Sequence, residues 1–316
     1  MPNTAKVHCT KTALLLLSLA VLAACKPAAP ETSGSNPSAT ASAAAPKQEA
    51  HSMDKQQTAP AIAPPSPGEV IAAIYDERGD SSDSYEVANG AVATFWYGHQ
   101  FDFGGKRYYT GFAYSTAEKY GKDKQEDFAA PDEQVTLSQA TFERGSDAAH
   151  PWVFFGAQPA LGEFGGYERG PDADTARKAK TFATAAGGEI LAVPASESVN
   201  EGISAYYYEI FERAPNQDDP NRLGPWRYLS SVDAGGDNAA GCASDPADAK
   251  LLPPCVKSVG EIAFEAVAGQ DLPRISVALS GTRIDGPGKT VALDPNQPLH
   301  YVFDAKDQAY RPVATN

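Results

Sequence analysis

Histidine is the side chain that most often acts as a general acid or base, so the histidines bear first on any catalytic function. Three of the five, His99, His150 and His300, lie in the part of the chain that contains the aromatic residues. None belongs to an HxH, HExxH or HxxxH pattern, which would predict a metal site, and no GxSxG pattern predicts a nucleophilic serine. A Ser-His-Asp triad can still assemble from distant residues on any fold. The sequence therefore leaves a hydrolase open without indicating one.

Residues 232–238 (VDAGGDN) form a polar segment with oxygen-bearing side chains. Asp233, Asp237 and Asn238 stand on a backbone loosened by two glycines, as a calcium loop requires. The spacing matches no EF-hand, which has acids at alternate positions and a closing glutamate. The same residue types are common in ordinary turns. The segment is a candidate calcium loop with a plain turn as the alternative, and the sequence indicates no other cofactor.

Aromatic side chains cluster at Phe95–Tyr97 and Tyr206–Tyr208. Successive strand residues point to opposite faces, so each triplet supplies rings to both faces of a sheet. One face must be core. The other is either the core of a second layer or an exposed platform for a glycan, a peptide or a protein. The candidate ligand surface consists of Trp96, Tyr207, Trp226 and Tyr228.

The first residues have the composition of a signal peptide. Lys6 and Lys11 precede an apolar run, Ala13–Ala24, that is shorter than the roughly 20 residues of a membrane-spanning helix. The run ends in Leu22-Ala23-Ala24-Cys25, which closely resembles the lipobox of bacterial class II signal peptides. In that family the leader is cut before the cysteine, and the cysteine thiol and new amino group are acylated.

The resemblance implies that residues 1–24 are removed and that Cys25 carries the lipid. Each buried methylene contributes about 0.8 kcal/mol, so several acyl chains hold a protein to a membrane almost irreversibly. Lys26 takes the position at which Asp, in this class, tends to retain the protein in the inner membrane. We therefore expect a lipid-anchored protein of the bacterial cell envelope, on the outer membrane and facing the periplasm.

Two cysteines remain once the leader is removed and Cys25 is acylated. Cys9 leaves with the leader, so Cys242 and Cys255 form an even pair in an oxidising compartment. We predict a disulfide between them, which stabilises the fold by roughly 3 kcal/mol in the chain-entropy model. Free thiols or half of a metal site are the alternatives, although no CxxC pattern is present.

Residues 25–65 are rich in Ala, Pro, Ser, Thr and Gln, and no aromatic residue precedes Tyr75. Such a segment cannot bury enough apolar surface to become ordered. We predict a disordered tether over residues 25–65 and one globular domain over residues 66–316. The whole chain has a formal net charge of −14, and removal of Lys6 and Lys11 with the leader leaves 24 basic and 40 acidic residues. The resulting charge, 24 − 40 = −16, lies in this domain because the charges of the tether cancel. An acidic domain repels phosphate backbones, so we expect no nucleic-acid partner.

Helical spacing of apolar residues is clear at Pro67–Arg78, with Gly79 as its end. Gly-Gly pairs at 104–105 and 187–188 mark tight hairpins. The other apolar runs read as strands separated by turn residues. The predicted strands are Val92–Phe103, Lys106–Ser115, Gln134–Glu143, Trp152–Phe155, Lys180–Thr184, Glu189–Val193, Ile203–Arg213, Trp226–Val232, Ser258–Val267, Arg274–Leu279 and Tyr301–Asp304.

This order predicts a mainly-β domain with one short N-terminal helix, built as an antiparallel β-sandwich, an open barrel or a propeller-like array. Because no catalytic signature is present, we expect a non-catalytic domain that binds an envelope protein or glycan. One alternative is an inhibitor or immunity lipoprotein against a basic cell-wall hydrolase, which the acidic charge would suit. The other alternative is a tethered hydrolase.

Overall fold

Two antiparallel sheets and one helix make up the described part of the chain. The computed structural model describes residues 62–77, 82–119, 129–200, 202–243 and 252–313. They belong to one compact unit, Pro60–Asn316. The leader, Cys25 and nearly all of the predicted tether lie outside the described residues. Across the described ranges, no helix is long and apolar enough to cross a membrane.

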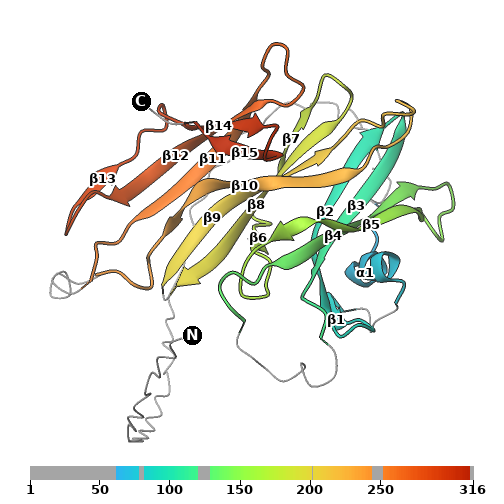
Figure 1. Ribbon diagram of the computed structural model, residues 1–316, viewed down its shortest axis with the longest axis horizontal. Helices are drawn as coiled ribbons and strands as arrows, with labels where there is room; N and C mark the ends of the chain where they lie inside the picture. The colour runs from blue at the N-terminus through green and yellow to red at the C-terminus, as the bar shows by residue number, and fades with distance from the viewer. Residues whose placement is uncertain (1–61, 78–81, 120–128, 201, 244–251, 314–316) are drawn as a thin grey trace, which may run out of the picture. The chain divides into compact units, whose positions relative to one another are not determined.

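Helix α1 (Pro67–Tyr75) opens the unit (Figure 1). A capping box fixes its start, because Ser66 Oγ accepts a hydrogen bond from the Glu69 N–H at 3.4 Å and the Glu69 carboxylate accepts one from the Ser66 N–H at 2.7 Å. The helix ends before the predicted Arg78. Asp76 adopts a left-handed conformation (φ 56°) that terminates it, a stop signal that glycine more often supplies.

A five-stranded antiparallel sheet packs against α1. Its strands, in spatial order, are β1 (Ser84–Glu86), β2 (Val92–Phe103), β3 (Lys106–Ser115), β4 (Val135–Arg144) and β5 (Trp152–Phe164). The helix buries Val70 and Ile71 completely. It approaches β3 so closely that a Cβ atom at Gly111 would lie 2.5 Å from a Val70 methyl carbon, so a side chain at position 111 would push the helix away.

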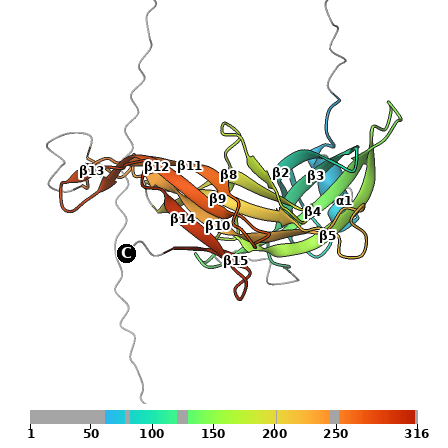
Figure 2. The ribbon, with the colours of Figure 1, turned by 90° about the horizontal axis from the view of Figure 1, so that it is seen from above.

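A ten-stranded antiparallel sheet forms the rest of the unit (Figure 1). Its main path runs β15 (Ala309–Pro312), β14 (Leu299–Asp304), β12 (Arg274–Ile284), β11 (Lys257–Glu265), β10 (Trp226–Asp237), β9 (Ile203–Arg213), β8 (Glu189–Asn200) and β6 (Asp172–Ala173), with β13 (Thr290–Ala292) beside β12 and β7 (Lys180–Ala183) beside β8. In both views β11 and β12 lie at the end of the unit opposite α1 (Figures 1 and 2).

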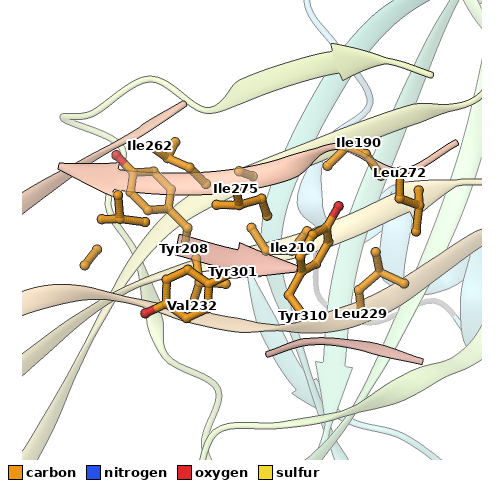
Figure 3. Close-up of a cluster of buried hydrophobic side chains, with 13 residues drawn as sticks. Ile190, Tyr208, Ile210, Leu229, Val232, Ile262, Leu272, Ile275, Tyr301 and Tyr310 are labelled. Atoms are coloured by element: carbon orange, nitrogen blue, oxygen red, sulfur yellow. The ribbon is translucent and has the colours of Figure 1, made fainter. Parts of the chain in front are cut away.

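Beyond β10 the larger sheet rolls over itself. The N–H of Tyr310 on β15 donates to Ser230 Oγ on β10 at 3.2 Å, although these strands are not neighbours in the sheet. Figure 3 shows the side chains that fill the enclosed space, which we call the rolled core. Its buried members are Ile190, Ala192, Tyr208, Ile210, Leu229, Val232, Ala234, Ile262, Leu272, Ile275, Val277, Tyr301 and Tyr310. Neither sheet closes on itself.

The opposite face of β8–β10 packs on the five-stranded sheet. The side chains between the two sheets form the sandwich core, whose buried members are Trp96, Phe101, Tyr108, Phe112, Val135, Leu137, Phe164, Leu191, Val193, Ala195, Phe211 and Trp226. Gln158 of β5 also joins the sheets, because its amide donates to the Trp226 carbonyl at 3.0 Å and accepts from the Trp226 N–H at 2.9 Å. The prediction of a mainly-β fold with antiparallel sheets and one short helix is confirmed.

The sequence did not predict four short strands, β1, β6, β13 and β15. Each has only two to four residues, too few to show an alternating pattern. It also ended β5 at Phe155, whereas the strand continues to Phe164. The added residues include Gly156, Pro159 and Gly162, which are weak strand formers. Their pairing with β4 holds them in the sheet.

Candidate functional site

The three histidines lie in separate places. His99 is on β2 between the sheets, His150 is exposed in the turn between β4 and β5, and His300 is on β14 beside Asp233. His99 has a carboxylate partner, since its Nε2 lies 3.1 Å from Glu189 Oε1. The histidines therefore form no common site, and His99 alone merits a closer description.

His99 belongs to a partly buried chain of polar side chains that spans β2, β8 and β9. The second oxygen of Glu189 lies 3.6 Å from Nε of Arg213, which is only 4% exposed. The Arg213 guanidinium lies against Phe101 and Phe103, 5.2 and 4.9 Å from their ring centres. Burial lowers the pKa of Arg213, and the Glu189 charge opposes this shift. Glu189, held between two basic side chains, fixes the orientation of the imidazole.

Two residues of the candidate calcium loop, Asp233 and Asp237, belong to strand β10 rather than to a loop or a plain turn. Gly235-Gly236 continues that strand through a β-bulge. Each of the three candidates uses a side-chain oxygen to accept a backbone N–H: Asp233 at 2.8 Å, Asp237 at 3.2 Å and Asn238 at 2.8 Å. In the described residues, no three His, Cys, Asp or Glu side chains gather closely enough to hold a metal ion.

The predicted cysteine pair follows β10. The sulfur atoms of Cys242 and Cys255 are 1.96 Å apart, at disulfide distance. Asn238 braces the start of the connection, since its amide donates to the Pro254 carbonyl at 3.0 Å. The residues 244–251 within the connection lie outside the described ranges. The predicted disulfide is confirmed.

The predicted aromatic platform is wrong for Trp96 and Trp226, which are 8% and 2% exposed. Both are members of the sandwich core. Their indole N–H groups are also used inside the molecule: Trp96 donates to the Pro171 carbonyl at 2.7 Å and Trp226 to Thr110 Oγ1 at 3.1 Å. The two strand faces are both core here, because a second sheet covers the face that could have been exposed.

Tyr228, a third member of that platform, holds a buried carboxylate. Its hydroxyl donates to Glu209 Oε2 at 2.7 Å, and Ser231 Oγ donates to the same oxygen at 2.6 Å. Glu209 is 1% exposed. Burial raises the pKa of Glu209. The hydrogen bonds from Ser231 and Tyr228 lower this pKa, and the charge of the neighbouring Glu197 raises it further. Glu209 could not be predicted as a site residue, because a charged residue within YEIFER gives no sign of complete burial.

A strained turn lies in the connection between β5 and β6. Tyr167 and Glu168 occupy the centre of the turn Gly166–Arg169 with φ values of 54° and 51°. Positive φ at both central residues is the pattern of a type I′ turn, which Asn and Gly usually occupy. For other residues a left-handed conformation costs about 1 kcal/mol each. Gly166 and Arg169 close the turn by two backbone hydrogen bonds of 3.1 and 3.0 Å.

Neighbouring segments hold this turn in place. The Tyr167 N–H donates to the Ala130 carbonyl at 3.2 Å, and the Glu168 N–H donates to the Glu133 carbonyl at 2.7 Å. The Glu168 carboxylate also binds Lys119 Nζ at 2.6 Å. These contacts keep both residues in a rarely populated conformation. Such strain is typical of functional sites, where surrounding structure stabilises it.

The turn borders a hollow of 490 Å³, which we call the Tyr167 hollow. Its polar and aromatic lining consists of Tyr167, Arg169, Asp172, Ser196, Glu197 and Ser198. Tyr167 is 45% exposed, so its ring is open to solvent. Arg169 and Asp172 form an ion pair of 2.6 Å across the rim. The hollow thus offers a ring face together with hydroxyl, carboxylate and guanidinium groups.

Two ionisable residues near the hollow, Glu197 and Tyr207, have shifted pKa values. Burial raises the pKa of Glu197, and Arg169 opposes that shift. Burial also raises the pKa of Tyr207, with smaller contributions from Glu197, Asp233 and Glu209. Tyr207 is half-buried rather than exposed. Of the four predicted platform residues, it is the one whose electrostatic environment includes a residue of the hollow.

A faint signal for the hollow is present in the amino-acid sequence. Residues 165–170 (GGYERG) place glycines on both sides of a polar and aromatic pair. Gly165 has φ 72°, and a Cβ atom there would lie 2.0 Å from the Arg169 carbonyl oxygen, so this backbone path requires glycine. Flanking glycines indicate a turn but not its central conformation.

Comparison of the chain with family models, with curated proteins and with solved structures finds no significant match.

Proposed function

We propose that the chain is a lipoprotein of the bacterial envelope, anchored by acyl chains on Cys25, which displays a non-catalytic domain that binds a glycan. We place it on the outer membrane, facing the periplasm. The observation that carries the glycan proposal is the strained turn that presents Tyr167 beside the hollow. The lipobox resemblance at Leu22-Ala23-Ala24-Cys25 supports the anchor.

The strain at Tyr167 supports a binding role because it has no benefit for folding. Asn or Gly at position 167 would make the same turn without the cost. A tyrosine here supplies a flat, rigid ring with a hydroxyl, which buries much area at low entropic cost when a ligand stacks on it.

The composition and size of the hollow support a sugar as the ligand. Carboxylates, hydroxyls and a guanidinium provide both acceptors and donors, which sugar hydroxyl groups require. A volume of 490 Å³ is in the range of small-molecule sites. Asp172 and Glu197 oppose the single cation of Arg169, so the hollow favours a neutral sugar over a polyanion.

The test is co-sedimentation of the lipidated mature protein, in detergent, with insoluble cell-wall glycan. We expect wild-type protein to sediment with the glycan and the Tyr167→Ala variant to bind at least tenfold more weakly, which corresponds to about 1.4 kcal/mol. Val302→Ala serves as control, because Val302 is an exposed side chain, 40% accessible, on the distant strand β14. That variant should sediment like wild type.

Several outcomes would overturn the proposal. Equal sedimentation of the Tyr167→Ala and wild-type proteins would remove the hollow as the glycan site. Release of soluble sugar during incubation would show catalysis and favour the hydrolase. Retention of a basic cell-wall hydrolase in place of glycan would favour the inhibitor.

The anchor has its own test. Mass spectrometry of the purified mature protein should find an acylated N-terminal Cys25, and Cys25→Ser should release the protein from the membrane fraction. An uncut leader or an unmodified thiol at Cys25 would refute the lipoprotein proposal, whatever the glycan experiment shows.

A protein partner is the second candidate, favoured by the start of β5. Val153, Phe154 and Phe155 are 56%, 53% and 45% exposed, and β5 is the edge strand of its sheet. Exposed apolar residues on an edge strand suit the addition of a partner's strand. A photo-crosslinker at Phe154 should then capture one envelope protein, whereas the same crosslinker at Val302 should not. Identical products at both positions would dismiss this candidate.

A further inference from the structure

A second hollow lies beside His99, away from the Tyr167 turn. It has a volume of 400 Å³ and opens between β2 and the segment that leads into β7. We call it the His99 hollow. Its polar lining residues are Tyr97, His99, Thr175, Arg177, Lys178 and Thr181. No carboxylate is among the residues that line it, although the chain as a whole carries a net charge of −14.

Every polar side chain of this lining can donate a hydrogen bond. Lys178 is an exposed ammonium group, and Arg177 is a guanidinium that cannot lose its proton. Thr175 and Thr181 supply hydroxyl groups. Burial raises the pKa of Tyr97, which keeps its hydroxyl protonated at neutral pH. A hollow lined by donors and cations is complementary to an oxyanion.

Contacts within the protein hold the side chains of His99 and Arg177 in place before any ligand binds. The His99 ring stacks on Phe101, with ring centres 5.6 Å apart, and its Nε2 faces Glu189 at 3.1 Å. Arg177 donates from Nε to Asp174 at 2.7 Å and lies over the Tyr208 ring at 5.3 Å. Groups held by the protein lose little entropy when a ligand arrives, so their hydrogen bonds contribute more to affinity.

The electrostatics behind His99 also favour an anion in front of it. Glu189 is shared with Arg213, whose Nε and Nη1 have no hydrogen-bond partner although the side chain is buried. The Glu189 charge is therefore offset by Arg213 rather than left to act on the hollow. The contact of Nε2 with Glu189 at 3.1 Å fixes the orientation of the His99 ring beside the hollow.

We propose that the His99 hollow binds a phosphate group, held by Lys178 and Arg177 from the segment before β7 and by His99 from β2. A phosphate suits this arrangement because its oxygens point in several directions and the donors approach from two elements. This inference does not rest on the proposed glycan function, since the two hollows share no lining residue.

Calorimetric titration of the full-length mature protein with inorganic phosphate at low ionic strength tests the proposal. We expect measurable binding in wild type and at least fivefold weaker binding in both Lys178→Gln and His99→Gln. Lys180→Gln is the matched control, because Lys180 is also exposed and lies two positions along the chain but does not line the hollow. It should change the affinity by less than a factor of two.

The lysine pair keeps the test decisive if His99→Gln fails to fold. Equal weakening by Lys178→Gln and Lys180→Gln would overturn the proposal, because it would show general attraction to surface charge. Absence of binding with about 10 mM phosphate, ten times a Kd of about 1 mM, would overturn it as well. Tyr167→Ala should leave phosphate binding unchanged.

Two competition arms identify the source of the phosphate group. A soluble sugar phosphate that displaces inorganic phosphate would point to a free metabolite or a phosphorylated glycan. Displacement only by vesicles that contain phosphatidic acid would point to a lipid headgroup. Both results support the site, and failure of every phosphate compound to displace inorganic phosphate would contradict it.

Discussion

The two faces of strands β8–β10 are both buried but differ in chemistry. The rolled core on one face consists of aliphatic side chains and tyrosines. The sandwich core on the other face is mainly aromatic and contains both of the buried tryptophans. It also has ionisable neighbours, since Glu209 binds Tyr228, and Arg213 lies against Phe101. Ionisable groups border the rolled core as well, since Arg227 lies 5.8 Å from the ring centre of Phe303 and pairs with Glu212, which is 2% exposed.

This difference indicates how the two cores contribute to function. In the rolled core, polar atoms of the aromatic rings reach backbone groups, as Tyr208 does with the Gly260 carbonyl at 3.2 Å and Tyr310 with the Pro273 carbonyl at 3.0 Å. Such bonds satisfy buried groups and leave no charge behind. Beside the sandwich core, Tyr97 and Ala179 pack against the buried side chains and also line the His99 hollow. We therefore propose that the sandwich side positions the binding groups.

The largest effect should come from a matched pair of truncations in the two cores. Phe211→Ala and Ile210→Ala remove neighbouring, fully buried side chains that point to opposite faces of β9. Each should lower the free energy of unfolding by about 2–5 kcal/mol, with Phe211→Ala the more damaging. Phe211 contacts the rings of Trp96 and Phe112, at centre distances of 5.7 and 4.7 Å, so it joins the two sheets.

Tryptophan fluorescence separates the two truncations, because Trp96 and Trp226 belong to the sandwich core and the rolled core contains none. Phe211→Ala should shift the emission of the native protein to longer wavelength, whereas Ile210→Ala should destabilise without a shift. Equal shifts in both variants would break the distinction between the two cores.

A smaller effect is expected from neutralising the buried acid of the sandwich side. Burial raises the native pKa of Glu209 above its ordinary value of 4.5. At pH values below 4.5, Glu209 is protonated in both the native and the unfolded state, and its raised native pKa makes its full contribution to the free energy of unfolding. As the pH rises, the unfolded state ionises first, so the contribution is lost up to the raised native pKa.

The glutamine of Glu209→Gln keeps an oxygen that can accept hydrogen bonds from Tyr228 and Ser231. Unlike the carboxylate, it cannot ionise. The stability of this variant relative to wild type should therefore increase by at least about 1 kcal/mol between pH 4 and pH 8. Thermal unfolding at several pH values measures the change. Glu261→Gln, at an exposed position on β11, is the control and should show a constant difference. A constant difference for Glu209→Gln would contradict the account of this carboxylate.

The sequence was sufficient for the fold class because its signals are local. Alternating strands, the Gly104-Gly105 hairpin and the helix at Pro67 all follow from short-range patterns. Strands of two to four residues such as β6 and β13 could not be predicted, because long-range pairing alone defines them. The sequence also could not show that β8–β10 would be covered on both faces, which is why Trp96 and Trp226 were assigned to a platform.

The candidate sites depended on conformations and contacts that the sequence does not display. The Gly235-Gly236 pair between Asp233 and Asp237 suggests a turn, but pairing with β9 keeps both aspartates in a strand. Tyr167 gave no signal of its own, since its left-handed conformation arises from bonds to residues 130–133. His99 was recognised as a candidate residue, while its partner Glu189 lies 90 positions away in the chain.

The most direct test of the account is to measure stability and glycan binding together in Tyr167→Asn. Asn tolerates the left-handed conformation, so the variant should gain roughly 0.5–1 kcal/mol in unfolding free energy while Glu168 still binds Lys119. The same variant should lose at least tenfold in affinity for cell-wall glycan. Greater stability with reduced binding would support a turn strained for function, and undiminished glycan binding would contradict it.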